Sequence, residues 1–242
     1  MKIFRFLLIA GLVFWSCKGG ESSDSKTDDS QSKKTKAVSL YDGVPVRALP
    51  VKDGKYLTSL NLGETMLYLG ETRADSTDSK NEFYKVELSD GSVAWARTYG
   101  VIIDAEPAAI VGETPVYKRP DLVNKTNESF YKLEFVAVIA NKGEWIEVVG
   151  SNRKKSGWIQ SQYISTAKND VAVATLATKA ILNSNGEIQI EKVPDFLADL
   201  PYDEYIFKTY LQNIADEQVE QAVVNAIEEY EDEYYEEEAA EE

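Results

Sequence analysis

The sequence VPVRALP at residues 44–50 recurs as TPVYKRP at residues 114–120, and this repeated stretch organises the chain. Both versions place two prolines around a short alternating run, which is typical of a strand that ends in a turn. Further matches follow in the same order: residues 64–70 with 134–140, 83–87 with 145–149, and 94–96 with 157–159. The repeat predicts two β modules, which we place at residues 38–104 and 105–167.

Each match is a short β-branched or aromatic run between turn residues, as expected for the strands of a small sheet. Asp90-Gly91 in the first copy is a strong hairpin signal, and Lys142-Gly143 has a similar place in the second. About five short strands in roughly sixty residues favour a closed barrel, because closure leaves no free strand edge. The first copy is longer by a polar insert at residues 71–81.

These motifs resemble those of the bacterial SH3-like domain. The residues that carry the resemblance are Arg47, Gly63-Glu64, Val86, Asp90-Gly91 and Trp95 in the first copy, and Trp145 to Val148, Gly157-Trp158 and Tyr163-Ile164 in the second. The copies depart from the family pattern at Phe83, Ala94, Tyr117 and Leu133. The resemblance covers about half of the chain and implies two tandem SH3-like barrels whose aromatic grooves bind extended peptides.

Alternation along a strand indicates which aromatic side chains are free to bind a ligand. The apolar face of the expected strand at residues 83–88 holds Tyr84, Val86 and Leu88. Phe83 shares the other face with Lys85 and Glu87, so we expect Phe83, and Trp145 by alignment, to be half-exposed. The candidate ligand-binding residues are Tyr41, Phe83, Trp95, Tyr117, Trp145 and Trp158. The alternative for each is a core residue that closes one end of a small barrel.

Residues 1–16 have the layout of a signal peptide: Lys2 and Arg5, an apolar run at residues 6–15, then a small residue. The run has roughly half the length that a bilayer span needs. Cys17 is the only cysteine, and the sequence FWSC at residues 14–17 resembles a relaxed bacterial lipobox. This resemblance implies that Cys17 is lipidated and anchors the protein to a membrane. The alternative is a free core thiol in an unprocessed N-terminus.

Residues 17–37 are expected to form a flexible linker after the lipidated cysteine. From Lys18 to Lys36 no large apolar residue occurs, so this segment cannot bury enough surface to offset its ordering entropy. In bacterial lipoproteins resembling this chain, an Asp at the position of Lys18 acts as an inner-membrane retention signal. Its absence favours the outer membrane, with the periplasmic or surface face left open.

A helical period replaces the strand period at residues 168–230. The first expected helix has Asn169 or Asp170 as its N-cap and ends before Asn185-Gly186. Its apolar stripe is Val173, Leu176, Ala177, Ala180 and Ile181. Two more helices are expected at residues 202–214 and 216–230. The third carries a stripe of Val219, Ala222, Val223, Ala226, Ile227 and Tyr230. These helices either pack on the second barrel and on one another or recruit a partner helix.

Residues 231–242 are expected to form an acidic disordered tail. Ten acidic residues and no basic residue lie between Glu228 and Glu242, and acids at a helix C-terminus oppose the helix dipole. We expect the third helix to fray there. The tail is either a solvated solubilising segment or a site for loose calcium binding or for a basic partner.

The composition argues against several classes of function. With a net charge of −15 the chain is a poor nucleic-acid binder. It has no histidine and only one cysteine, so we expect no metal site, no cofactor and no catalytic residue of the common hydrolase types. The chain is therefore not expected to be an enzyme, and a carboxylate-only glycosidase is the remaining enzymatic alternative.

We expect a lipid-anchored cell-envelope protein whose tandem SH3-like modules bind an envelope ligand, with peptidoglycan peptides as the first candidate by family resemblance. The alternative is a surface-exposed lipoprotein whose helices or acidic tail contact other proteins or host molecules.

Overall fold

The computed structural model describes residues 34–241, with side chains as far as residue 228. The predicted signal peptide, Cys17 and most of the predicted linker lie outside these residues, so those predictions stay untested. The first strand begins at Thr35, within the segment that we expected to be linker. Thr35 and Lys36 pair with Tyr68 and Leu67, so backbone pairing orders these polar residues.

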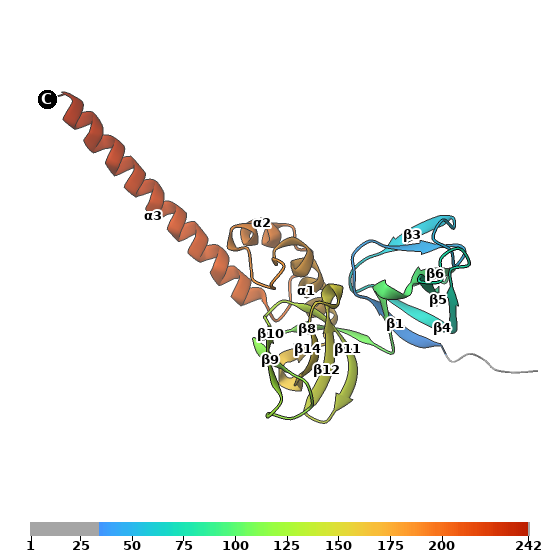
Figure 1. The fold of residues 1–242 in the computed structure, drawn as a ribbon. Coiled ribbons are helices and arrows are strands. Elements are labelled where there is room, and N and C mark those ends of the chain that lie inside the picture. The colour runs from blue at the N-terminus through green and yellow to red at the C-terminus, as the bar shows by residue number, and fades with distance from the viewer. Residues whose placement is uncertain (1–33, 242) are drawn as a thin grey trace, which may run out of the picture. The chain divides into compact units, whose positions relative to one another are not determined.

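The first module is a seven-stranded antiparallel sheet (Figure 1). Its strands are β1 (Thr35–Ser39), β2 (Val44–Arg47), β3 (Tyr56–Leu60), β4 (Thr65–Ala74), β5 (Glu82–Glu87), β6 (Val93–Arg97) and β7 (Val101–Ile103), with the short helix η1 (Thr98–Gly100) before β7. The second module is another seven-stranded sheet. Its strands are β8 (Glu106–Ile110), β9 (Thr114–Tyr117), β10 (Lys125–Phe130), β11 (Phe135–Lys142), β12 (Trp145–Gly150), β13 (Ser156–Gln160) and β14 (Ile164–Ser165), with η2 (Ser151–Arg153) and η3 (Ser161–Tyr163).

The two sheets share one topology, which confirms the predicted repeat. The strand orders are β3-β2-β6-β5-β4-β1-β7 and β10-β9-β13-β12-β11-β8-β14, so each strand of the first module has its counterpart in the second. The predicted hairpins are also present, since Gly91 and Gly143 take positive φ angles of 81° and 64° in their turns. Only glycine adopts such angles without steric cost. Each sheet has two more strands than the sequence indicates.

Each module has its own apolar core, built from the inward side chains of its strands. In the first module this core includes Val46, Val86 and Ala96, and in the second it includes Ile110, Val148 and Ile159. A third cluster spans both modules and brings Val38 and Leu40 together with Phe135, Ala137 and Val149. Asn152 donates its backbone N–H to the Leu40 carbonyl at 2.7 Å across the same junction.

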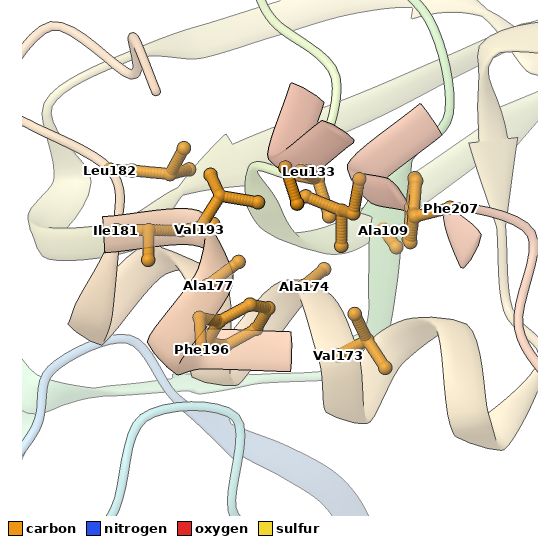
Figure 2. Close-up of a cluster of buried hydrophobic side chains, with 12 residues drawn as sticks. Ala109, Leu133, Val173, Ala174, Ala177, Ile181, Leu182, Val193, Phe196 and Phe207 are labelled. Carbon is orange, nitrogen blue, oxygen red and sulfur yellow. The ribbon is translucent and has the colours of Figure 1, made fainter. Parts of the chain in front are cut away.

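Three helices follow the sheets, and their apolar side chains pack on the second module (Figure 2). They are α1 (Lys168–Ala180), α2 (Val193–Ala198) and α3 (Lys208–Glu241), with the short helix η4 (Ile190–Lys192) before α2. Their shared core joins α1, α2 and the start of α3 to Ala109 and Leu133 of the second module. The mainly β fold with a helical C-terminal part is therefore confirmed.

The first helix differs from the prediction in two details. Asp170 is buried and does not cap α1; it accepts hydrogen bonds from the Ser165 hydroxyl at 2.5 Å and from the Ile206 backbone at 2.8 Å. The carboxylate therefore ties β14 and the segment before α3 to α1. The buried stripe is Val173, Ala174, Ala177 and Ile181, whereas Leu176 and Ala180 are exposed.

The last helix is longer than expected. The sequence suggested one helix at residues 202–214 and another at 216–230, but α3 runs without interruption from Lys208 to Glu241. Ala215 and Asp216 continue the helix, because neither residue breaks it and Ala215 packs into the helical core. The helix includes the acidic segment 231–241 that we expected to be disordered. Among the described residues, no helix is long and apolar enough to cross a membrane.

Candidate ligand-binding face

Three of the predicted aromatic residues meet on one face of the second module. Trp145 lies on β12, Trp158 on β13 and Tyr117 on β9, and these three strands are neighbours in the sheet. Trp158 stands opposite Tyr117 on β9 and opposite Glu147 on β12. Side chains opposite one another across paired strands lie on the same face. The inward neighbours Ile146, Val148 and Ile159 are buried core residues, so these aromatics lie on the outer face.

The aromatic rings on this outer face form a partly exposed platform. Tyr117 and Trp145 meet edge to face, with ring centroids 5.0 Å apart and an interplanar angle of 82°. Tyr117 is buried, whereas Trp145 and Trp158 are half-buried. Lys142 and Gln160 stand opposite Trp145 on its two neighbouring strands. The platform thus combines two accessible indoles with the cation of Lys142, the amide of Gln160 and the carboxylate of Glu147.

The equivalent face of the first module has a different chemistry. By strand register, Phe83 and Trp95 take the places of Trp145 and Trp158, because Phe83 pairs with Arg97 and Trp95 pairs with Lys85 and Arg47. The surrounding positions are cationic: Arg47 replaces Tyr117, Lys85 replaces Glu147, Arg97 replaces Gln160, and Arg73 replaces Lys142. Four basic side chains therefore surround two aromatic rings on this face.

These basic side chains cover the aromatic rings of the first module. The Arg73 guanidinium and the Lys85 ammonium lie 5.4 and 5.8 Å from the centre of the Trp95 ring. Arg97 lies 5.8 Å from the Phe83 ring and also donates to the side chain of Asn81. Long cationic side chains lay their apolar stems over such rings while their charges stay in water. As a result Phe83 is 0% exposed and Trp95 is 7% exposed.

Glu71 fixes two of the covering cations. Its carboxylate lies 2.8 Å from the Lys85 ammonium and 2.5 Å from the Arg73 guanidinium. The hydrogen bond from Lys85, followed by that from Arg73, holds the pKa of Glu71 below its usual value. The carboxylate therefore stays charged at neutral pH and keeps both cations over Trp95.

Two loops beside this face are joined by one buried carboxylate. Asp75, in the β4–β5 loop, accepts the backbone N–H of Lys52, in the β2–β3 loop, at 2.6 Å. The same carboxylate accepts the Thr77 hydroxyl at 2.6 Å and the Thr77 N–H at 2.8 Å. These bonds, with that of the Thr77 hydroxyl the strongest, lower the pKa of Asp75 to about 2. Arg47 adds a hydrogen bond of 2.7 Å to the Gly54 carbonyl.

The expectation of a half-exposed Phe83 is therefore wrong. The alternation was read correctly, since Phe83, Lys85 and Arg97 do share the outer face, but this face is covered by its own charged side chains. Trp145, at the equivalent position, is half-buried as expected. Tyr41 belongs to neither face: its ring meets Tyr99 at 5.4 Å, and its hydroxyl donates to the Asn152 carbonyl at 3.0 Å, at the junction of the modules.

The sequence analysis missed the polar residues that distinguish the two faces. Arg73, Arg97 and Gln160 were not considered, and Arg47 and Lys142 were noted only for the family resemblance and for a hairpin turn, not as residues of a binding face. Alternation alone places Arg97 two residues from Trp95, and Gln160 two residues from Trp158. The pairing of Arg73 with Phe83 required the register of β4, which a bulge shifts between Tyr68 and Thr72.

Comparisons with known proteins add little to this geometry. No family model matches the chain, and no curated protein matches it. Among nine matching chains of solved structure are NlpC2 and NlpC1 from Trichomonas vaginalis, each with a TM-score of 0.25. They are 13% and 12% identical over 62% and 73% of this chain. The chain spans 58% and 57% of their lengths, and so remote a likeness carries no argument about function.

The described residues contain no cluster of three or more His, Cys, Asp or Glu side chains that could hold a metal ion.

Proposed function

We propose that this chain is a lipid-anchored protein of the cell envelope whose second module binds a peptide ligand, the stem peptide of peptidoglycan being the first candidate. Residues Trp145 and Trp158 would contact the ligand directly, with Tyr117 packing edge to face against Trp145. Cys17 would carry the lipid anchor, and the outer membrane is the proposed location.

One observation carries the proposal: the second module keeps its two outer indoles accessible, whereas the first module covers the equivalent rings with cations. Aromatic rings offer large contact area at small entropic cost, and they are enriched at binding hot spots. The platform also carries both charge signs, in Lys142 and Glu147. An extended peptide with free carboxylate and ammonium groups complements such a surface.

The proposal is tested by co-sedimentation of the full chain with purified peptidoglycan sacculi in a nonionic detergent. We expect the protein to sediment with the sacculi, and the Trp145→Ala/Trp158→Ala variant to bind about thirtyfold more weakly, the effect of losing a hot spot of about 2 kcal/mol. Tyr56→Ala, which removes an exposed aromatic from the first module, serves as the control and should bind normally. Equal binding by all three proteins would contradict a role of the aromatic platform in binding. No binding by the wild type would contradict peptidoglycan as the ligand.

The anchor is tested separately by labelling cells with radioactive palmitate. The wild type should incorporate the label and fractionate with the outer membrane, and Cys17→Ser should do neither. A labelled Cys17→Ser protein, or an unlabelled wild type, contradicts lipidation at Cys17.

A further inference from the structure

The last helix has two parts with different environments. In its first turns α3 belongs to the helical core, where Leu211 and Ala215 are buried beside Phe207. From Val219 to Glu228 every residue is exposed. The described residues of the helix therefore pass from a packed segment to a segment surrounded by solvent.

The exposed segment still carries an apolar face. We call it the α3 stripe: Val219, Ala222, Val223, Ala226 and Ile227. Spacings of three and four residues place these side chains along one side of a helix. Val219 and Ile227 are 60% and 54% exposed. The stripe lies on the same side of α3 as Ala215, so the helix face that packs into the core at Ala215 continues into the exposed segment.

Solvation alone does not explain this choice of residues. Valine and isoleucine are poorer helix formers than Ala, Glu or Lys, and an isolated helix gains nothing from exposing them. Helices in proteins are stabilised mainly by packing of their apolar faces. The stripe therefore has the properties of a surface that another molecule covers.

The charge of α3 indicates which kind of molecule covers the stripe: a second copy of the chain, a membrane or another protein. Residues 209–242 contain thirteen acidic residues and no basic residue. A second copy of α3 would bring a second set of acids against the first, which opposes pairing in either direction. A membrane surface is also a poor match, because membrane-binding helices are rich in Lys and Arg and bilayers carry anionic lipids.

We propose that the α3 stripe is a docking surface for a protein that presents a basic amphipathic helix. The partner's apolar side chains would cover Val219, Val223 and Ile227, and its Lys or Arg side chains would face Asp216 and Glu220, which border the stripe. The seam is short, since Val219 to Ile227 rises only about 12 Å. Binding is therefore weak, in the micromolar range, and depends strongly on salt. This inference is independent of the ligand of the second module.

The test uses a fluorescein-labelled synthetic peptide of three heptads, with Leu at the a and d positions and Lys at the flanking e and g positions. Its counterpart has Glu in place of every flanking Lys. Fluorescence anisotropy measures the binding of both peptides to the full chain at low and moderate salt. The test variant is Val223→Gln/Ile227→Gln, because Gln keeps helix propensity and removes the apolar surface. Leu122→Gln/Val123→Gln changes two exposed apolar residues of the β9–β10 loop, away from α3, and is the matched control.

We expect the basic peptide to bind with micromolar affinity, and the α3 variant to bind it at least tenfold more weakly at unchanged helicity by circular dichroism. The control should match the wild type, and the acidic peptide should not bind. Equal binding of the two peptides, or equal binding by the α3 variant, overturns the proposal. So does a dimer in sedimentation equilibrium that the α3 variant abolishes, which would assign the stripe to a second copy. Flotation of the wild type but not the α3 variant with anionic phospholipid vesicles, with Cys17→Ser in both, would assign it to a membrane.

Discussion

Replacing Lys155 with Met should destabilise the second module by about 2–3 kcal/mol at pH 7. The Lys155 ammonium lies 2.5 Å from Glu134 Oε1, and the two side chains are only 18% and 10% exposed. Lys155 also donates to the Ser129 carbonyl at 2.9 Å, and Glu134 Oε1 accepts the Tyr131 N–H at 3.0 Å. Methionine keeps the contact with the neighbouring rings but leaves the carboxylate buried without its cation. The expected loss is below the 3–5 kcal/mol typical of fully buried pairs, because some solvent reaches both groups.

The pH dependence of this effect has a definite sign. Burial raises the pKa of Glu134 above its ordinary value of 4.5, and the hydrogen bond and charge of Lys155 oppose that rise. A carboxyl with a raised pKa stabilises the fold fully below pH 4.5, and this contribution is lost as the pH rises through the folded-state pKa. Without Lys155 the pKa of Glu134 rises further. Lys155→Met should therefore lose stability between pH 4.5 and 7 more steeply than the wild type, and Glu134→Gln less steeply.

Urea unfolding of the full chain at pH 4 and pH 7 measures these differences. Lys125→Met is the matched control, since Lys125 is exposed on the same module and the change should alter stability by less than about 0.5 kcal/mol. The double variant Glu134→Gln/Lys155→Met should return to within about 1 kcal/mol of the wild type, because no charge is left buried. If Lys155→Met were as stable as the control at pH 7, or if the double variant were no better than the single one, the reasoning about this ion pair would be wrong.

Three further predictions concern the packing of the modules. Gly186→Ala should destabilise the protein by about 2 kcal/mol or more in urea unfolding, because Gly186 has a φ of +88° and an added Cβ would collide with the Glu134 carboxylate. Asp75→Asn should make the free energy of unfolding depend less on pH in acid. The Asp75 carboxyl has its pKa lowered from 3.8 to about 2, so its contribution to stability is present above pH 3.8 and is lost as the pH falls through 2. Unfolding between pH 4 and pH 2 checks this. Trp95→Ala should cost about 3 kcal/mol of stability yet leave co-sedimentation with sacculi unchanged, as expected of a buried ring that contacts no ligand.

The repeat could be predicted from the sequence because its signals are local. Prolines at equal spacing, the hairpin at Asp90-Gly91 and the position of Trp95 relative to Trp158 all survive in both copies. Strand alternation also assigned the faces correctly, since its period is fixed by backbone geometry. These features follow from neighbours in the chain, and the shared strand order of the two modules confirms them.

The exposure of each face could not be predicted in the same way. Phe83 is buried because Arg97 lies over it from β6 and Arg73 pairs with it from β4, and the position of Arg73 depends on a bulged register. Asp170 resembles an N-cap in the sequence, but its partners are Ser165 and the distant Ile206. In both cases the contacting residue comes from another part of the chain and is positioned by tertiary packing. The local sequence pattern therefore predicts the face of the strand or the end of the helix, but not the burial or the hydrogen-bond partners of the side chain.

The most direct test of the proposed binding face is amide hydrogen exchange of the full chain with and without a synthetic peptidoglycan stem pentapeptide. Protection should appear in β9, β12 and β13, where Tyr117, Trp145 and Trp158 lie, and β2, β5 and β6 of the first module should not change. Protection confined to the first module, or none at saturating peptide, would contradict the assignment of ligand binding to the second module.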